Sequence, residues 1–105
     1  MACEISVWAS VLPDNATEMD DGTLFIDRVH GSGEIEGRYR KKDAPPPGED
    51  ITNGTCVNDQ LDFDIVGFHY SGKIKGRIIK GKKKTRQTDK KEFSGEEVWV
   101  GVKTA

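Results

Sequence analysis

The chain has 105 residues, of which 34% are apolar and 32% are charged, with a formal net charge of −2 at pH 7. A chain of this length predicts one domain over residues 1–105, which buries roughly 65% of the surface that it exposes when unfolded. No apolar run approaches the roughly 18 residues of a membrane-spanning helix, which excludes that class of protein. The first residues show no basic segment followed by an apolar one, so we expect no signal peptide and a cytoplasmic protein, with secretion as the alternative.

The residue types favour strands over helices. Valine and isoleucine together number 16, against 8 for leucine and alanine. Branching at Cβ restricts the side chain in a helix but packs well on a pleated sheet. No window of a dozen residues has helical apolar spacing, whereas several segments alternate between apolar and polar residues. The pattern predicts strands over 5–11, 23–29, 34–40, 61–68, 73–79 and 97–103.

Alternation also predicts which side chains of each strand face the core. In the first strand it places Ile5, Val7, Ala9 and Val11 inward, opposite Ser6, Trp8 and Ser10. In the last strand Val98, Val100 and Val102 alternate with Glu97, Trp99 and Lys103. The apolar members of three other strands are Ile35 and Tyr39; Leu61, Phe63 and Ile65; and Ile74 and Ile78.

Two segments do not fit this pattern. Residues 41–60 contain three consecutive prolines at 45–47, which lack the N–H that a strand ladder needs. We expect a long surface loop there, with at most one short strand inside. Residues 80–91 are too polar to bury, so they predict either a mobile loop or a protruding hairpin.

The chain contains an internal repeat. Residues 30–38 and 69–77 align at a constant offset of 39, with six of nine positions identical. Each copy reads His, Ser-Gly, Ile and Gly-Arg at the matching positions. We interpret the copies as two structurally equivalent hairpins, each with Ser-Gly in its turn and its isoleucine inside.

Short antiparallel strands with bending glycines predict an all-β fold. We expect a small antiparallel up-and-down barrel of six to eight strands with an internal hairpin repeat, because closure removes exposed sheet edges. A β-sandwich is the alternative.

The order of the strands resembles the calycin group, and within it the avidin-like barrels. The segment 22–39 is similar to the second and third avidin strands, 61–68 to the fifth and 73–79 to the sixth. In that family a tyrosine and tryptophans line a ligand cavity, a role that the resemblance gives to Tyr39 and Trp99. Phe68 stands where the family has a ligand-stacking tryptophan, and Trp8 lacks the polar loop that follows its counterpart. These departures argue against biotin as the ligand.

The leading functional hypothesis is a non-catalytic binding protein without a cofactor. A small molecule, or a side chain of a protein partner, would bind in the apolar mouth of the barrel. The candidate ligand-binding residues are Trp8, Tyr39, Phe68 and Trp99. A barrel enzyme is less favoured, because the sequence has no Ser-His-Asp order and no phosphate-binding loop.

The alternative hypothesis uses the segregated charge. Residues 1–64 hold 14 acidic and 5 basic side chains, whereas residues 65–105 hold 4 acidic and 11 basic ones. The basic segment 80–91 and the proline-rich loop 43–50 would then form a protein-binding or anion-binding module, with association between copies of the chain as another use of the asymmetry. The segment lacks interleaved aromatic residues, which disfavours nucleic acid. The candidate anion-binding residues are Lys82, Lys83, Lys84 and Arg86.

The histidines and cysteines carry weaker signals. His30 and His69 occupy equivalent repeat positions, and duplication alone explains the match, so we expect no metal site. Cys3 and Cys56 lack the Cys-x-x-Cys spacing. The absence of a visible signal peptide favours two free thiols, with one long-range disulfide as the alternative.

Overall fold

The structure is a computed structural model that describes residues 3–86 and 93–105. These residues form an all-β fold, and no helix among them is long and apolar enough to cross a membrane. Nine antiparallel strands are present in the described residues. They are β1 (Ser6–Leu12), β2 (Asn15–Val29), β3 (Ile35–Lys41), β4 (Glu49–Asp50), β5 (Thr52–Val57), β6 (Gln60–Ile65), β7 (Phe68–Lys75), β8 (Ile78–Arg86) and β9 (Phe93–Lys103).

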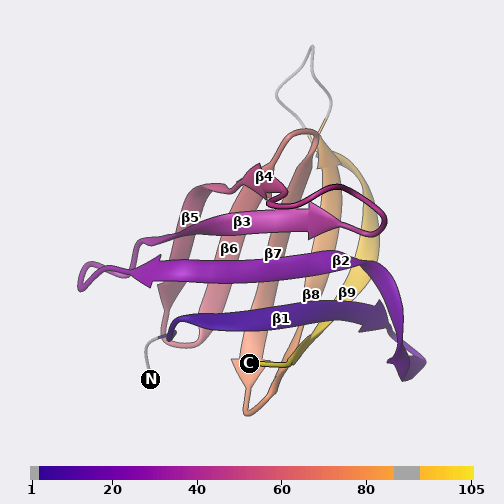
Figure 1. Cartoon of the computed structure of the whole chain (residues 1–105), viewed down its shortest axis with the longest axis horizontal. Helices are drawn as coiled ribbons and strands as arrows, with labels where there is room; N and C mark the ends of the chain where they lie inside the picture. Colours follow the sequence, from indigo (N-terminus) through magenta and orange to yellow (C-terminus); the bar gives the residue numbers. More distant parts are fainter. Residues whose placement is uncertain (1–2, 87–92) are drawn as a thin grey trace.

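The strands form one nearly closed up-and-down barrel, as predicted. The hydrogen-bonded order is β4-β3-β2-β1-β9-β8-β7-β6-β5, so the first and last strands pair and join two meanders. The remaining gap, between β3 and β5, is bridged by the Glu34–Thr55 pair and by a hydrogen bond from Cys56 N to Gly33 O at 2.7 Å. In Figure 1, β1 to β3 run across β5 to β9, so the sheet wraps around one interior.

Two predicted loops contain more strand than expected. The segment 41–60 includes both β4 and β5, so the prediction of a loop with at most one short strand is wrong. Its proline-rich part lies between β3 and β4, where the carbonyls of Ala44 and Pro47 accept hydrogen bonds from Arg40 and Arg38. In the basic segment, residues 80–86 belong to β8, which pairs with β9, so these residues form a hairpin rather than a mobile loop. The rest of that segment, residues 87–91, lies outside the described residues.

The two copies of the repeat are not structurally equivalent. His30 to Gly33 form the turn between β2 and β3, with Gly33 at a φ of 97°. The matching residues of the second copy, 69–72, lie inside β7. The turn falls instead at Gly76, whose φ of 64° suits glycine at the first central position of a two-residue hairpin loop. The predicted strand 73–79 is therefore split, and Ile79 rather than Ile78 points into the core.

The inward faces of the first and last strands are the reverse of those predicted by the valines. Trp8 and Trp99 are 3% and 1% exposed, whereas Ile5 and Val98 are 70% and 53% exposed; Val11 and Val100 are buried as well, at 6% and 7%. Neither face of these strands is charged throughout, so alternation alone does not choose between them. An indole buries more area than a valine, and Trp8 Nε1 donates a hydrogen bond to the inward-facing Ser6 Oγ at 2.8 Å. The face that carries the tryptophans is therefore the inner one.

The predictions for the middle strands are confirmed. Ile35, Tyr39, Leu61, Phe63 and Ile65 are buried in one core cluster, and Ile74 packs against it. The two isoleucines of the repeat thus share the interior, although their local structures differ.

Cys3 and Cys56 form a disulfide, so the prediction of free thiols is wrong. Their Cα atoms are 5.8 Å apart, within the usual range for a bridge. The bridge ties the segment before β1 to β5, on the opposite side of the barrel. Sequence spacing gave no sign of it because 53 residues separate the two cysteines.

Removal of the disulfide should lower the free energy of unfolding by about 2–4 kcal/mol, because the bridge closes a long loop in the unfolded chain. Chemical denaturation of the wild type with and without dithiothreitol, and of a Cys3→Ala/Cys56→Ala variant, measures the loss. The reductant should leave the variant unchanged. Equal stability of the oxidised and reduced wild type would contradict the prediction.

Candidate functional site

Three of the four predicted ligand-binding residues lie close together in the barrel interior. Tyr39 from β3 and Trp99 from β9 both pack against the Tyr70 ring of β7, with ring centroids 5.1 and 5.3 Å away. Phe63 stacks on Tyr70 at 4.8 Å. Phe68 lies farther out, 6.5 Å from Tyr70 and only partly buried. The side chains fill this part of the interior with rings, so Tyr39 and Trp99 are core residues in this state of the protein.

A carboxylate sits at the edge of this aromatic cluster. Oδ2 of Asp21, on β2, accepts hydrogen bonds from the Tyr39 hydroxyl at 3.0 Å, from the Tyr70 hydroxyl, and from Lys83 Nζ at 3.2 Å. The four residues come from four strands, β2, β3, β7 and β8. The side chains of Asp21 and Lys83 are only 19% and 17% exposed. We call these four residues the Asp21 network.

The network fixes the protonation of its members. Burial alone would raise the pKa of Asp21, but the hydrogen bond from Tyr70, the charge of Lys83 and the hydrogen bond from Tyr39 outweigh it, so the pKa of Asp21 is lowered. Burial, and then the neighbouring groups of the network, raise the pKa of the hydroxyls of Tyr39 and Tyr70. At neutral pH the carboxylate is therefore ionised and both phenols are protonated donors.

Within residues 3–86 and 93–105, two buried side-chain polar atoms have no protein hydrogen-bond partner. These are Ser10 Oγ and Trp99 Nε1, both on residues that are almost fully buried. Buried polar groups nearly always find a partner, and a bound water is the usual one where protein groups are missing. The interior of the barrel is therefore polar in two places, the Asp21 network and these two atoms.

Phe68 marks the rim of the barrel at the Asp21 end. Lys83 Nζ lies 4.3 Å and Lys41 Nζ 5.0 Å from the centre of its ring. Such contacts are favourable because the face of an aromatic ring carries partial negative charge. Phe68 is the predicted residue whose ring is both partly exposed and next to cations.

Trp8 lies apart from the other predicted residues, in a cavity near the ends of the chain. The cavity measures about 310 Å³ and is lined by Cys3, Glu4, Ser6, Trp8, Asp59, Ile74, Gly76 and Lys103. Trp8, Ile74 and the disulfide provide apolar surface. Lys103 and Glu4 form an ion pair on its wall, and the hydrogen bond and charge of Lys103 lower the pKa of Glu4. We call this the Trp8 cavity.

The predicted anion-binding residues do not form one patch. Lys83 points into the barrel and bonds Asp21, whereas Lys82 points outward and pairs with Glu96 at 2.5 Å. Lys84 lies on the same outer face. The hydrogen bond from Lys82 is the largest cause that lowers the pKa of Glu96, and the charges of Lys82 and Lys84 lower it further. Arg86 ends β8, and its side chain lies outside the described part of the chain. Anion binding by this segment stays a prediction, and the Lys83 side chain bonds Asp21 inside the barrel.

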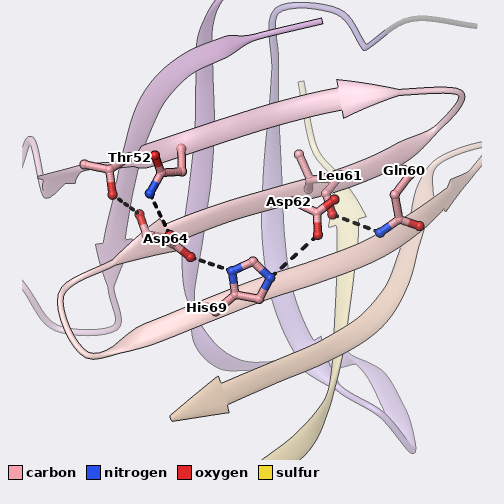
Figure 2. A network of polar contacts seen from close by, with 7 residues as sticks. Thr52, Gln60, Leu61, Asp62, Asp64 and His69 are labelled. Carbon is pink, nitrogen blue, oxygen red and sulfur yellow. Dashed lines mark hydrogen bonds and ion pairs between the residues drawn. The ribbon is translucent and has the colours of Figure 1, made fainter. Parts of the chain in front are cut away.

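The histidines take part in polar networks on the outer surface. Figure 2 shows His69 of β7 between two aspartates of β6: Nδ1 is 2.5 Å from Asp64 Oδ1, and Nε2 is 3.6 Å from Asp62 Oδ1. Asn53 Nδ2 donates to the other oxygen of Asp64 at 2.9 Å. His30 meets Glu36 at 2.5 Å. Within residues 3–86 and 93–105, no group of three or more His, Cys, Asp or Glu side chains has the arrangement of a metal site.

Sequence reasoning missed Asp21, Tyr70 and the lining residues of the Trp8 cavity other than Trp8. Asp21 is one of two consecutive aspartates before a glycine, and nothing local distinguishes the inward one. Its partners lie 18, 49 and 62 residues away, so only the closed barrel brings them together.

Comparison with known proteins identifies no relative: no family model, no curated protein and no solved structure matches the chain. The resemblance to avidin-like barrels therefore stays a prediction, and the function must be argued from the geometry alone.

Asp21→Asn should lower the free energy of unfolding at pH 7 by about 1–3 kcal/mol, because a charged acceptor with three donors is lost. The folded-state pKa of Asp21 is lowered, so its stabilisation is present above the unfolded-state pKa and disappears as the pH falls through the folded-state value. Urea denaturation at pH 7 and under acid conditions should therefore show a difference between wild type and variant that shrinks in acid.

Asp27→Asn is the matched control. Asp27 bonds Arg38 at 3.1 Å on the surface, where an ion pair contributes at most about 1 kcal/mol. Equal losses in the two variants would show that the Asp21 network is no more stabilising than a surface pair.

Proposed function

We propose that the protein is a non-catalytic binding protein and that a small ligand binds in the Trp8 cavity. The observation that carries the proposal is the cavity itself, about 310 Å³, with an indole and an aliphatic side chain on its wall and charged groups beside them. Ligand sites in proteins are mostly apolar with a few polar groups, and begin at about 300 Å³. The Trp8 cavity has this composition at the small end of the range.

The lining residues indicate the chemistry of the ligand. Ile74 offers surface to one apolar ring or a short aliphatic group, beside Trp8, which is 3% exposed. The ion pair of Glu4 and Lys103 offers one acceptor and one donor. An uncharged molecule of about one ring with a single hydroxyl or amide fits both, because it needs no unpaired charge in the cavity.

The disulfide bears on the cellular compartment in which the protein would bind its ligand. Cys3 both lines the Trp8 cavity and bonds Cys56, so the wall of the site depends on an oxidised bridge. Disulfides persist in oxidising compartments and are rare in the cytosol. The bridge therefore favours the secreted alternative over the cytoplasmic expectation.

The two tryptophans give a direct test, because one lines the cavity and the other is in the core. In a ¹H–¹⁵N spectrum the indole N–H signals of Trp8 and Trp99 are assigned with Trp8→Phe and Trp99→Phe variants. Titration with p-cresol, benzyl alcohol and cyclohexanol should shift the Trp8 indole signal saturably with at least one probe, and leave the Trp99 signal in place.

Ile74→Phe should fill part of the cavity and weaken binding of that probe at least about tenfold. Val66→Phe is the matched control, since Val66 is 82% exposed and does not line the cavity. Saturable shifts confined to Trp99, or no saturable shift with any probe, would contradict the proposal.

A further inference from the structure

Strands β1 and β9 carry apolar side chains on their outer faces. Their inward side chains include the two tryptophans, and their outward side chains are Val7, Ala9 and Val11 on β1 and Val98, Val100 and Val102 on β9. The strands pair directly, with Ala9 opposite Val102 and Val11 opposite Val100. In an antiparallel sheet with one face in water, the outer face is normally polar, so a row of apolar side chains on the outer face is unusual.

The apolar surface extends onto the neighbouring strands. Ile78 of β8 pairs with Val102, and Met19 of β2 pairs with Val11, so both side chains continue the outward rows. Met19, Ile78 and Val98 are 42%, 46% and 53% exposed. The outer valine face consists of Val7, Ala9, Val11, Met19, Ile78, Val98, Val100 and Val102, of which Val11 and Val100 are already buried in the single chain, at 6% and 7% exposed.

Opposite charges border the outer valine face on its two sides. On the β8 side, Lys80, Lys82 and Lys84 alternate along the strand and point outward, opposite Val100, Val98 and Glu96 of β9. On the β2 side, the exposed acidic residues Asp14, Glu18 and Asp20 lie on or beside the β1–β2 hairpin. In the sheet, β9 and β1 lie between β8 and β2.

We propose that the outer valine face is the interface of a homodimer. A two-fold axis lying in the interface and parallel to the strands turns the face onto itself. It sets the acidic side of one copy against the basic side of the other and the valines against valines. A copy of this chain therefore meets both requirements of the surface, an apolar centre and opposite charge on each border.

The two kinds of contact have different roles in this dimer. Burial of the valines supplies the free energy of association, at about 25 cal/mol per Å² of apolar surface. The exposed charges contribute little each, but they select the orientation of the two copies and penalise the reversed one. The remaining exposed apolar residues, Ile5, Val57 and Val66, lack this paired charge pattern.

Sedimentation equilibrium of the full chain over a hundredfold range of concentration measures the association. We expect a monomer–dimer equilibrium, and Val98→Lys should raise its dissociation constant at least about tenfold, because it replaces an exposed apolar side chain of the interface with a charge. Val66→Lys, on the turn between β6 and β7, should leave the constant unchanged. The outward position of both side chains preserves the fold, which the thermal unfolding curve checks.

Reversal of one border tests the partner. Lys80→Glu/Lys84→Glu makes both borders acidic, and Glu18→Lys/Asp20→Lys makes both basic, so each variant alone should dimerise more weakly than the wild type at low salt. An equimolar mixture of the two should associate at least as tightly as the wild type. A monomer throughout the range, equal effects of Val98→Lys and Val66→Lys, or no association in the mixture would overturn the proposal.

Discussion

The pairing of β1 with β9 is the constraint on which the rest of the structure depends. It joins the β1–β4 meander to the β5–β9 meander, which would otherwise be two open sheets with exposed edges. It also places Trp8 and Trp99 on the same face of the sheet, because Trp8 lies opposite Lys103, four residues after Trp99, and alternate residues of a strand share a face. Trp8 then reaches the cavity near the chain ends, and Trp99 reaches the aromatic cluster around Tyr70.

The class of fold could be predicted from the sequence because it depends on local patterns. The alternation in 34–40 and 61–65 has charged residues on one side, so only one face can be buried, and the inward residues of both were predicted correctly. The predicted strand 61–68 nevertheless runs too far, because β6 ends at Ile65 and β7 begins at Phe68. In β1 and β9 neither face is charged throughout, and alternation cannot decide. In these two strands the larger side chain faces inward, because an exposed indole would leave more apolar area in contact with water than an exposed valine.

Contacts between distant residues could not be predicted in the same way. The disulfide and the Asp21 network join residues that come together only when the barrel closes. The prediction of two equivalent hairpins from the repeat failed for a related reason. The two copies have similar sequences, but the glycine with a positive φ is Gly33 in the first copy and Gly76 in the second, which are not matching positions, and each turn forms at that glycine. The sequence of a segment limits the conformations that it can adopt, and its pairing with neighbouring strands selects one of them.

Alternate residues of β1 carry the two proposed roles. Ser6 and Trp8 face the cavity, while Val7 and Ala9 face outward, so ligand and second copy would contact the same strand from opposite sides without competing for a side chain. The backbone of β1 is bonded to β2 on one side and to β9 on the other, which holds the two faces at a fixed spacing. A polar residue in place of Val7 would therefore disturb the outer face alone, and a smaller residue in place of Trp8 would disturb the inner face alone.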